Sequence, residues 1–217
     1  MSTVVPGHEK RTPLSANEVV HAGRILTWLH TYISEPHTEL GRGGPICPFV
    51  PASLKTDALA FVVHSEIDGE SPEALSDLLL THMKDFAAAA PNSAHELRRR
   101  SLMIIVPNVK EERLHVLDSV QREVKNEMVR NGMMLGQFHL RCPDTAVRNP
   151  GFQVSIAPLP CFAIRHMAPH DILFLHDDRD WFAEYRRRFE NEYLQGKVKD
   201  PMMLDLYNRA QNHLEEE

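Results

Sequence analysis

Residues 160–171, Pro-Cys-Phe-Ala-Ile-Arg-His-Met-Ala-Pro-His-Asp, begin as an apolar run and end in side chains that can hold an anion, ligate a metal or exchange protons. Arg165 and His166 stand where a predicted strand gives way to a loop, the common place for functional groups on a rigid scaffold. His170 and Asp171 follow closely. We therefore expect this segment to form one wall of a functional site.

A second candidate wall is the segment 41–51, which is too rich in glycine and proline for regular structure. Its glycines permit close backbone approach to a ligand, and its prolines stiffen the chain around Cys47. We expect Cys47 to be presented rigidly as a thiolate ligand or nucleophile, with Arg42 and Phe49 as further binding residues. The alternative is a structural loop around a small buried thiol. The segment lacks the Gly-Lys-Ser/Thr ending of a phosphate-binding loop.

His139 closes the third predicted strand. If the later strands share one sheet, we expect His139, Arg165 and His166 to meet at one sheet end as the candidate catalytic residues. The loop that carries Cys47 then closes over them. The alternative is that a backbone carbonyl satisfies each histidine and that Arg165 pairs with Asp171 for structural reasons alone.

A haem site is the first kind of centre that these groups fit. Haem iron is held by a histidine or by a cysteine thiolate, and the groups around the axial ligand tune its chemistry. Cys47 is the candidate thiolate ligand and His166 is its main competitor. Arg42 or Arg165 is then placed to pair with a propionate, and Phe49 contributes to an apolar wall.

Two other kinds of site remain open. His166, His170 and Asp171 offer two imidazoles and a carboxylate in one segment, as a facial non-haem iron centre requires. Alternatively, Arg165 and His166 grip an anionic small molecule or partner, and no reaction follows. A nucleophilic Cys/His hydrolase is disfavoured, because no segment resembles a nucleophile elbow.

The elements that must position these residues follow from hydrophobic periodicity and from turn signals. Helices are predicted over about 15–34, 71–90, 111–131, 178–189 and from 200 onward, and strands over 58–64, 101–107, 133–139 and from 160 onward. Strands separated by single helices favour βαβ units, and the last two strands favour antiparallel pairing. We predict an α+β fold with a mixed sheet of about four strands covered by helices, in the order α-β-α-β-α-β-β-α-α. Residues 1–14 are expected to be a flexible N-terminus, and 15–217 a single domain with C-terminal helices.

The composition is ordinary for a globular protein, with 42% apolar and 25% charged residues among 217. The net charge of −6 argues against nucleic-acid binding, and the arginine runs 98–100 and 186–188 are typical of solvated faces or of anchors for one anionic group. No apolar stretch is long enough to span a bilayer, and residues 1–10 lack a signal-peptide core. Because the three cysteines also favour a reducing compartment, we expect a cytoplasmic protein. The apolar segment 202–206 packs either on the core or on a second subunit of a homodimer.

Four short motifs carry a family resemblance: Cys47-Pro48-Phe49, Gly136-Gln137-Phe138-His139, Asn149-Pro150 and Ala163-Ile164-Arg165-His166-Met167. Together they resemble a bacterial family known chiefly as a domain of unknown function, over roughly residues 40–190. The Ala-Ile-Arg-His-Met motif is the most specific of the four. This resemblance implies no activity.

More distantly, the layout resembles the haem-dependent N-oxygenases that hydroxylate arginine, guanidines or amines in bacterial specialised metabolism. In that family a Pro-Cys or Cys-Pro element lies early, and a strand, a long helix and a late aromatic-rich strand follow. Cys47 is the counterpart of the early cysteine, whereas the late part of this chain departs from the family pattern. The resemblance implies a haem-dependent oxidoreductase that acts on a nitrogen of a small amino-acid-like substrate. It places Arg165 on the substrate carboxylate and His139 or His166 as the proton donor.

Overall fold

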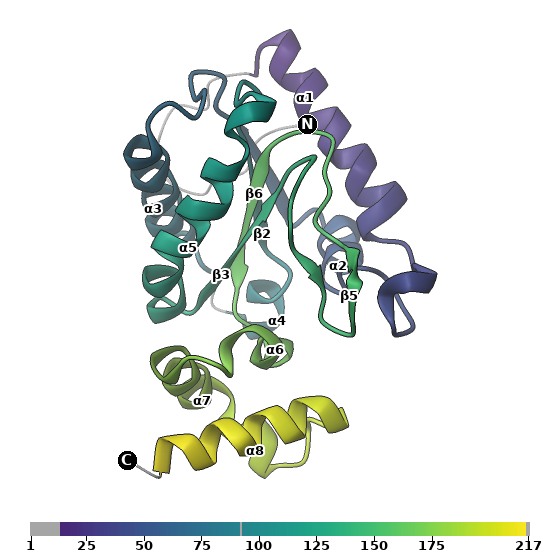
Figure 1. Ribbon diagram of the computed structural model, residues 1–217, viewed down its shortest axis with the longest axis vertical. Helices are drawn as coiled ribbons and strands as arrows, with labels where there is room; N and C mark the ends of the chain where they lie inside the picture. The colour runs from purple at the N-terminus through teal and green to yellow at the C-terminus, as the bar shows by residue number, and fades with distance from the viewer. Residues whose placement is uncertain (1–13, 92, 216–217) are drawn as a thin grey trace.

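A four-stranded mixed sheet stands at the centre of the fold, with strand order β1-β2-β6-β3 (Figure 1). Its strands are β1 (Leu59–Val63), β2 (Ser101–Ile105), β3 (Met133–Phe138) and β6 (Cys161–His166). β1 and β2 are parallel, whereas β6 runs antiparallel to both of its neighbours. The predicted α+β class with a mixed four-stranded sheet is therefore confirmed.

The computed structural model describes residues 14–91 and 93–215. Nearly all of the predicted flexible N-terminus, 1–14, lies outside these residues. None of the helices that the structure describes is both long and apolar enough to cross a lipid bilayer.

Helices cover both faces of the sheet (Figure 1). α3 (Pro72–Ala88) and α5 (His115–Arg130) pack on one face. α1 (Ala16–Trp28), which continues as a π-helical turn over Leu29–Ile33, packs on the other. Because both faces are covered, β2 is buried along its whole length, which explains its continuous apolar sequence.

Successive side chains of β6 point to opposite faces of the sheet. Phe162 and Ile164 belong to the core beneath α3 and α5, whereas Cys161 belongs to the core beneath α1. The alternation continues to the end of the strand. It places Arg165 on the α1 face and His166 on the α3 face.

Local sequence signals set the helix ends. Ser15 and Glu18 form a capping box at the start of α1, and the Ser71 hydroxyl caps α3 just before its first-turn proline. Gly132 follows α5 with a φ of +71°, the left-handed conformation that the Asn-Gly pair predicts. Its carbonyl accepts a hydrogen bond from the Met167 N–H at 2.9 Å, so the end of α5 is tied to the end of β6.

Some short elements have no clear signal in the sequence. Residues 140–159, predicted to be irregular, contain a small sheet of β4 (Thr145–Ala146) and β5 (Asn149–Gln153). A proline lies within β5, where it is tolerated because the strand pairs on one side only. The helices α2 (Val50–Lys55) and α4 (Ala94–Leu97) are too short to show a helical period.

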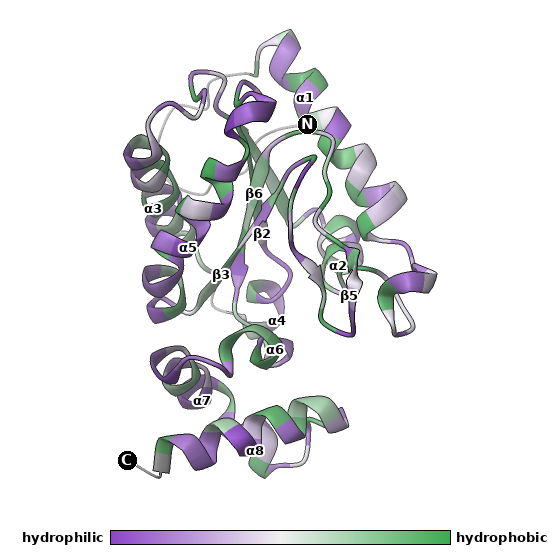
Figure 2. Cartoon of the chain, in the orientation of Figure 1, coloured by the Kyte–Doolittle hydropathy of each residue, from purple (hydrophilic) through white to green (hydrophobic). Residues whose placement is uncertain are grey.

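Three C-terminal helices, α6 (Ile172–Leu175), α7 (Arg179–Leu194) and α8 (Pro201–Glu215), lie below the sheet in Figure 1. They share a hydrophobic core of their own, in which Met203 and Leu206 are buried. The helices carry both hydrophobic and hydrophilic stretches, as expected when one side of each helix is covered (Figure 2). The apolar segment near the C-terminus thus packs within the chain itself.

Candidate thiolate site

The loop that carries Cys47 lies against the end of β6 on the α1 face of the sheet. The Arg165 guanidinium lies over the Phe49 ring, with 4.3 Å from Cζ to the ring centroid. His170 meets the same ring edge-on at a centroid distance of 6.1 Å. Cys47 is partly buried against the α1-face core. The structure thus brings together Cys47, Phe49, Arg165 and His170 from two distant segments. These four residues form the candidate thiolate site.

Arg165 is held by a bidentate ion pair with Asp171. Nη1 and Nη2 donate to the two carboxylate oxygens at 2.7 and 2.6 Å. Asp171 is fully buried, and it also accepts a 2.7 Å hydrogen bond from the Ala168 N–H. Burial alone would lower the pKa of Arg165, but Asp171 and then Cys47 raise that pKa above its usual value. The ion pair between Arg165 and Asp171 that the sequence allowed as an alternative is therefore present. Cys47 lies close enough to affect the pKa of Arg165.

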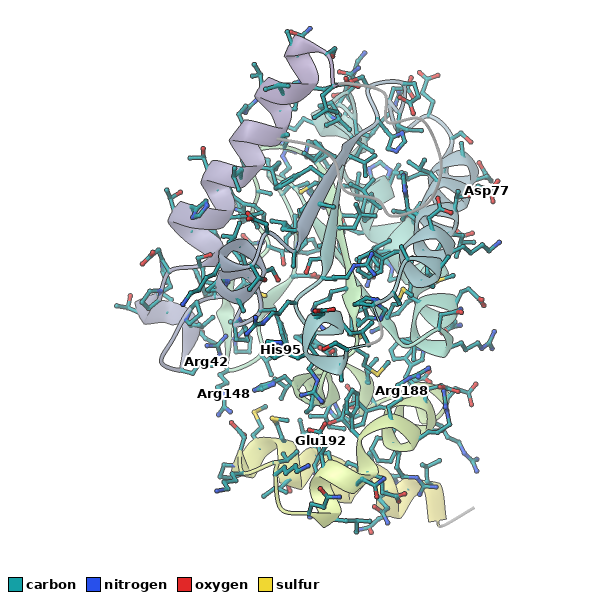
Figure 3. All side chains as sticks on the ribbon, turned by 180° about the vertical axis from the view of Figure 1, so that it is seen from behind. Arg42, Asp77, His95, Arg148, Arg188 and Glu192 are labelled. Atoms are coloured by element: carbon teal, nitrogen blue, oxygen red, sulfur yellow. The ribbon has the colours of Figure 1, made fainter. Side chains whose placement is uncertain are left out.

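The backbone of the Cys47 loop is tied to its surroundings at several points. The Cys47 N–H donates to the Ile33 carbonyl at 3.0 Å, and Arg42 Nη2 donates to the Ile46 carbonyl at 2.9 Å. Gly41, with a φ of +73°, lies so close to Arg148 that a Cβ there would stand 3.0 Å from the Arg148 Cβ. Arg42 and Arg148 lie near one another in Figure 3. Gly41 therefore permits close contact with the turn between β4 and β5, and the Arg42 side chain bonds to carbonyls of its own loop.

The three cysteines differ sharply in environment. Cys47 is partly exposed, whereas Cys142 and Cys161 are fully buried. Burial raises the pKa of Cys142 to about 12 and raises the pKa of Cys161 well above its usual value. Since the thiolate is the reactive and metal-binding form, Cys47 is the cysteine best placed for chemistry.

His139 lies at the opposite end of the sheet from His166. In the antiparallel β3–β6 pair, Phe138 stands opposite Cys161, whereas Met133 stands opposite His166. Strands rise about 3.3 Å per residue, so the two ends lie roughly 16 Å apart. The expectation that both histidines meet at one sheet end is wrong, because antiparallel strands have their carboxyl ends at opposite edges.

His166 also lies apart from the thiolate site. Its ring stacks on Phe86 of α3 at a centroid distance of 5.0 Å, on the other face of the sheet from Arg165. The expected facial metal site of His166, His170 and Asp171 is therefore not assembled. The carboxylate oxygens of Asp171 are also already bonded to Arg165 and to a backbone amide.

A second cluster surrounds His139 and includes a residue that the sequence did not single out. The His139 Nε2 lies 3.0 Å from Asp118 Oδ1, and the Arg141 N–H donates to His139 Nδ1 at 3.3 Å. The neutral ring therefore carries its proton on Nε2 and donates it to Asp118. Cys142 completes a trio whose potential ligand atoms all lie within 4.8 Å of one another. The His139-x-x-Cys142 spacing is visible in the sequence, but Asp118 comes from α5 and only the fold brings it here.

The sequence profile of a domain of unknown function, DUF6875, matches residues 22–200. The chain belongs to the DUF6875 family. The resemblance to a domain-of-unknown-function family is thus confirmed, and the DUF6875 region contains both the thiolate site and the His139 cluster. No curated protein and no solved structure matches the chain significantly.

Proposed function

We propose that this protein is a haem-binding oxidoreductase in which Cys47 would hold the haem iron. The observation that carries the proposal is the partly exposed Cys47 thiol near the partly buried Arg165 guanidinium. A cysteine ligates haem iron as the thiolate, and Cys47 is the cysteine whose side chain is not fully buried. The proposed reaction adds an oxygen atom to a nitrogen of a small amino-acid-like substrate, as the distant resemblance to N-oxygenases implies.

The residues around Cys47 fit this cofactor in three respects. The loop backbone is fixed by hydrogen bonds, Phe49 supplies an aromatic wall, and Cys47 supplies a partly exposed thiol. Bound haem would supply the activation of peroxide, or of O₂ together with two electrons from an external reductant, and the second oxygen atom would leave as water. Arg42 would have to exchange its contacts with two loop carbonyls for a propionate.

The chain's own residues take roles that differ from those expected from the sequence. Arg165 is a positioning residue, because Asp171 offsets its charge and holds its guanidinium in one plane. It packs over the Phe49 ring and orients it beside Cys47. His170 is exposed and adjacent to Phe49, so it is the imidazole of this site that a substrate can reach from solvent.

The test is reconstitution of the purified protein with hemin, followed by absorption spectroscopy. We expect a stoichiometric Soret band whose ferrous carbonyl form has the position typical of thiolate-ligated haem. Cys47→Ala should abolish that position, whereas Cys161→Ala is the matched control because this thiol is fully buried. Absence of a Soret band in the wild-type protein would overturn the proposal. Loss of the band in His166→Ala but not in Cys47→Ala would assign the ligand to the histidine instead.

A second candidate function is transition-metal binding at Asp118, His139 and Cys142. One observation favours it, namely the close grouping of an oxygen, a nitrogen and a sulfur ligand. Zinc takes this ligand set, with distances that require only small side-chain movements. Gln137 Nε2 also donates to Asp118 Oδ1 at 3.4 Å and so orients the carboxylate from outside the trio.

This metal site makes a distinct prediction about protons. The Cys142 thiol is neutral in the metal-free protein, because burial raises its pKa to about 12. Binding of Zn²⁺ must release that proton, and binding through Nε2 must also displace the proton that His139 donates to Asp118. Calorimetry with Zn²⁺ in buffers of different ionisation enthalpy should therefore detect proton release, which Cys142→Ser should reduce. A metal-free purified protein that takes up no Zn²⁺ would exclude this function.

A further inference from the structure

The ring of His166 is a buried imidazole with an unused nitrogen. Its Nε2 is inaccessible to solvent and has no hydrogen-bond partner among the residues that the structure describes. The ring stacks on Phe86, whose ring centroid also lies 4.5 Å from Cζ of Arg100. A buried polar nitrogen without a partner is costly, so such an atom in a native protein indicates a missing ligand or water.

Arg188 of α7 also has a buried side-chain nitrogen without a partner among the described residues. This atom is Nε, whereas Nη2 donates to the Arg130 carbonyl at 3.1 Å. A Cβ at Gly132 would stand only 2.7 Å from Arg188 Cζ, so the guanidinium packs directly on this turn. Gly132 precedes Met133, which stands opposite His166 in the sheet. Arg188 is therefore fixed at the His166 end, at the junction between the sheet and the C-terminal helices (Figure 3).

Positive charge around His166 exceeds the negative charge that offsets it. Burial, followed by the charges of Arg100 and Arg188, lowers the pKa of His166 to about 4. Glu184 is the carboxylate next to Arg188, at 3.3 Å, and it is shared with Arg187 at 2.9 Å. Arg100 forms no ion pair within the described residues, and its Nη1 donates instead to the Ala89 carbonyl at 2.6 Å.

We propose that His166, Arg100 and Arg188 form a binding site for a compact oxyanion, a phosphate or carboxylate group. The oxyanion accepts hydrogen bonds from Arg188 Nε and from the guanidinium nitrogens of Arg100 that remain free of the Ala89 carbonyl. His166 donates through Nε2 in the tautomer that places its proton there. Guanidinium groups are suited to this task because their planar N–H groups match the geometry of oxyanions.

Space for the rest of an anionic molecule lies on the Arg100 side. A pocket of about 190 Å³ is lined by Arg100 and Phe86 and also by Asp57 and Asp85, whereas His166 and Arg188 lie outside its lining. A water molecule occupies about 30 Å³ in the liquid, so the pocket can hold a group of several heavy atoms. The two arginines come from the runs 98–100 and 186–188, which are far apart in the chain and which the sequence predicts to be solvated faces or anchors for one anionic group.

This inference is independent of the proposed haem function, because the site lies on the opposite face of the sheet from Cys47. The test compares thermal stability in sodium phosphate, sodium acetate and sodium chloride at matched ionic strength. We expect saturable stabilisation of the wild-type protein by phosphate, by acetate or by both, but not by chloride. A response to phosphate alone identifies a phosphate group as the ligand, and a response to acetate identifies a carboxylate. No saturable response to either anion would overturn the proposal.

Arginine-to-glutamine variants show which residues bind the anion. Arg188→Gln and Arg100→Gln should each weaken the apparent anion affinity tenfold or more. Arg187→Gln is the matched control, because Arg187 lies next to Arg188 and shares Glu184 but faces solvent. Equal weakening in the control would show a nonspecific charge effect and would overturn the proposal. If the glutamine variants fail to fold, NMR of the wild-type protein provides the test. The signals of the Arg188 Nε–H and of the His166 ring should shift when phosphate or acetate is added. Unchanged signals would overturn the proposed oxyanion site.

Discussion

Arg165 and His166 are consecutive in β6, but their side chains serve opposite faces of the sheet. Arg165 binds Asp171 and covers the Phe49 ring, whereas His166 stacks on Phe86 beneath α3. The pleat of the strand enforces this separation, because neighbouring side chains alternate between faces. One dipeptide therefore contributes to two distinct sites, the thiolate site and the proposed oxyanion site.

The accessibility of Cys47 predicts selective chemical modification. Iodoacetamide at neutral pH should alkylate Cys47 in the folded protein, while Cys142 and Cys161 stay unmodified because both are fully buried with raised pKa values. Peptide mass spectrometry before and after denaturation measures this order. Alkylation of Cys142 as fast as Cys47 in the folded protein would contradict the structure.

The ion pair between Arg165 and Asp171 should be important for stability. Asp171→Asn leaves a mostly buried guanidinium without its charge partner, since the side-chain exposures are 18% for Arg165 and 0% for Asp171. We expect the free energy of unfolding to fall by about 3–5 kcal/mol. Denaturant titration measures the change.

The control for this prediction is Asp205→Asn. Asp205 pairs with Arg209 on the surface of α8, where both side chains are more than half exposed. Such pairs contribute less than about 1 kcal/mol. Similar losses of stability in the two variants would mean that the buried pair is no stronger than a surface contact.

Stability should fall as the pH drops from about 6.5 towards 4. Burial is the main cause that lowers the pKa of both His166 and His82 to about 4 in the folded protein. An unfolded histidine titrates near 6.5, so between these values the unfolded chain binds more protons and the free energy of unfolding decreases. Allowing for partial exposure of the rings, each histidine contributes roughly 1–2 kcal/mol to this loss.

The contribution of His166 can be isolated by substitution. His166→Phe keeps a ring against Phe86 but cannot titrate, so the variant should lose less stability than the wild-type protein between pH 6.5 and 4. Unfolding midpoints measured at several pH values give the comparison. An unchanged pH dependence in the variant would mean that His166 does not titrate differently in the folded and unfolded states.

Two glycines predict opposite effects of substitution by alanine. Gly132→Ala should be destabilising by about 1–3 kcal/mol, because φ is +71° and the new Cβ would stand 2.7 Å from Arg188 Cζ. Gly23→Ala should be stabilising by about 0.5–1 kcal/mol, because Gly23 lies within α1 and nothing stands within 4 Å of the added Cβ. Thermal melts of both variants provide the test. A shift in the same direction for both would contradict this reading of the Gly132 turn.

The His139 cluster combines features that are local in the sequence with a contact that only the fold creates. The strand end and the His139-x-x-Cys142 spacing are local features, so the sequence displays them. Asp118 occupies an ordinary helical position, and its contact with His139 exists only because α5 packs on β3. The same holds for Arg100 and Arg188, whose shared neighbour His166 cannot be inferred from either arginine run.

The sequence alone determined the order and type of the main elements, since periodicity, capping residues and breakers such as Ser15, Ser71 and Asn131-Gly132 act over a few residues. It also marked Cys47 and Arg165 as candidates for one site. Tertiary structure decided which candidates meet. The antiparallel register of β3 and β6 separates His139 from His166, and the pleat separates His166 from Arg165. Strand register and sheet face are properties of pairing between distant segments, so only the folded chain defines them.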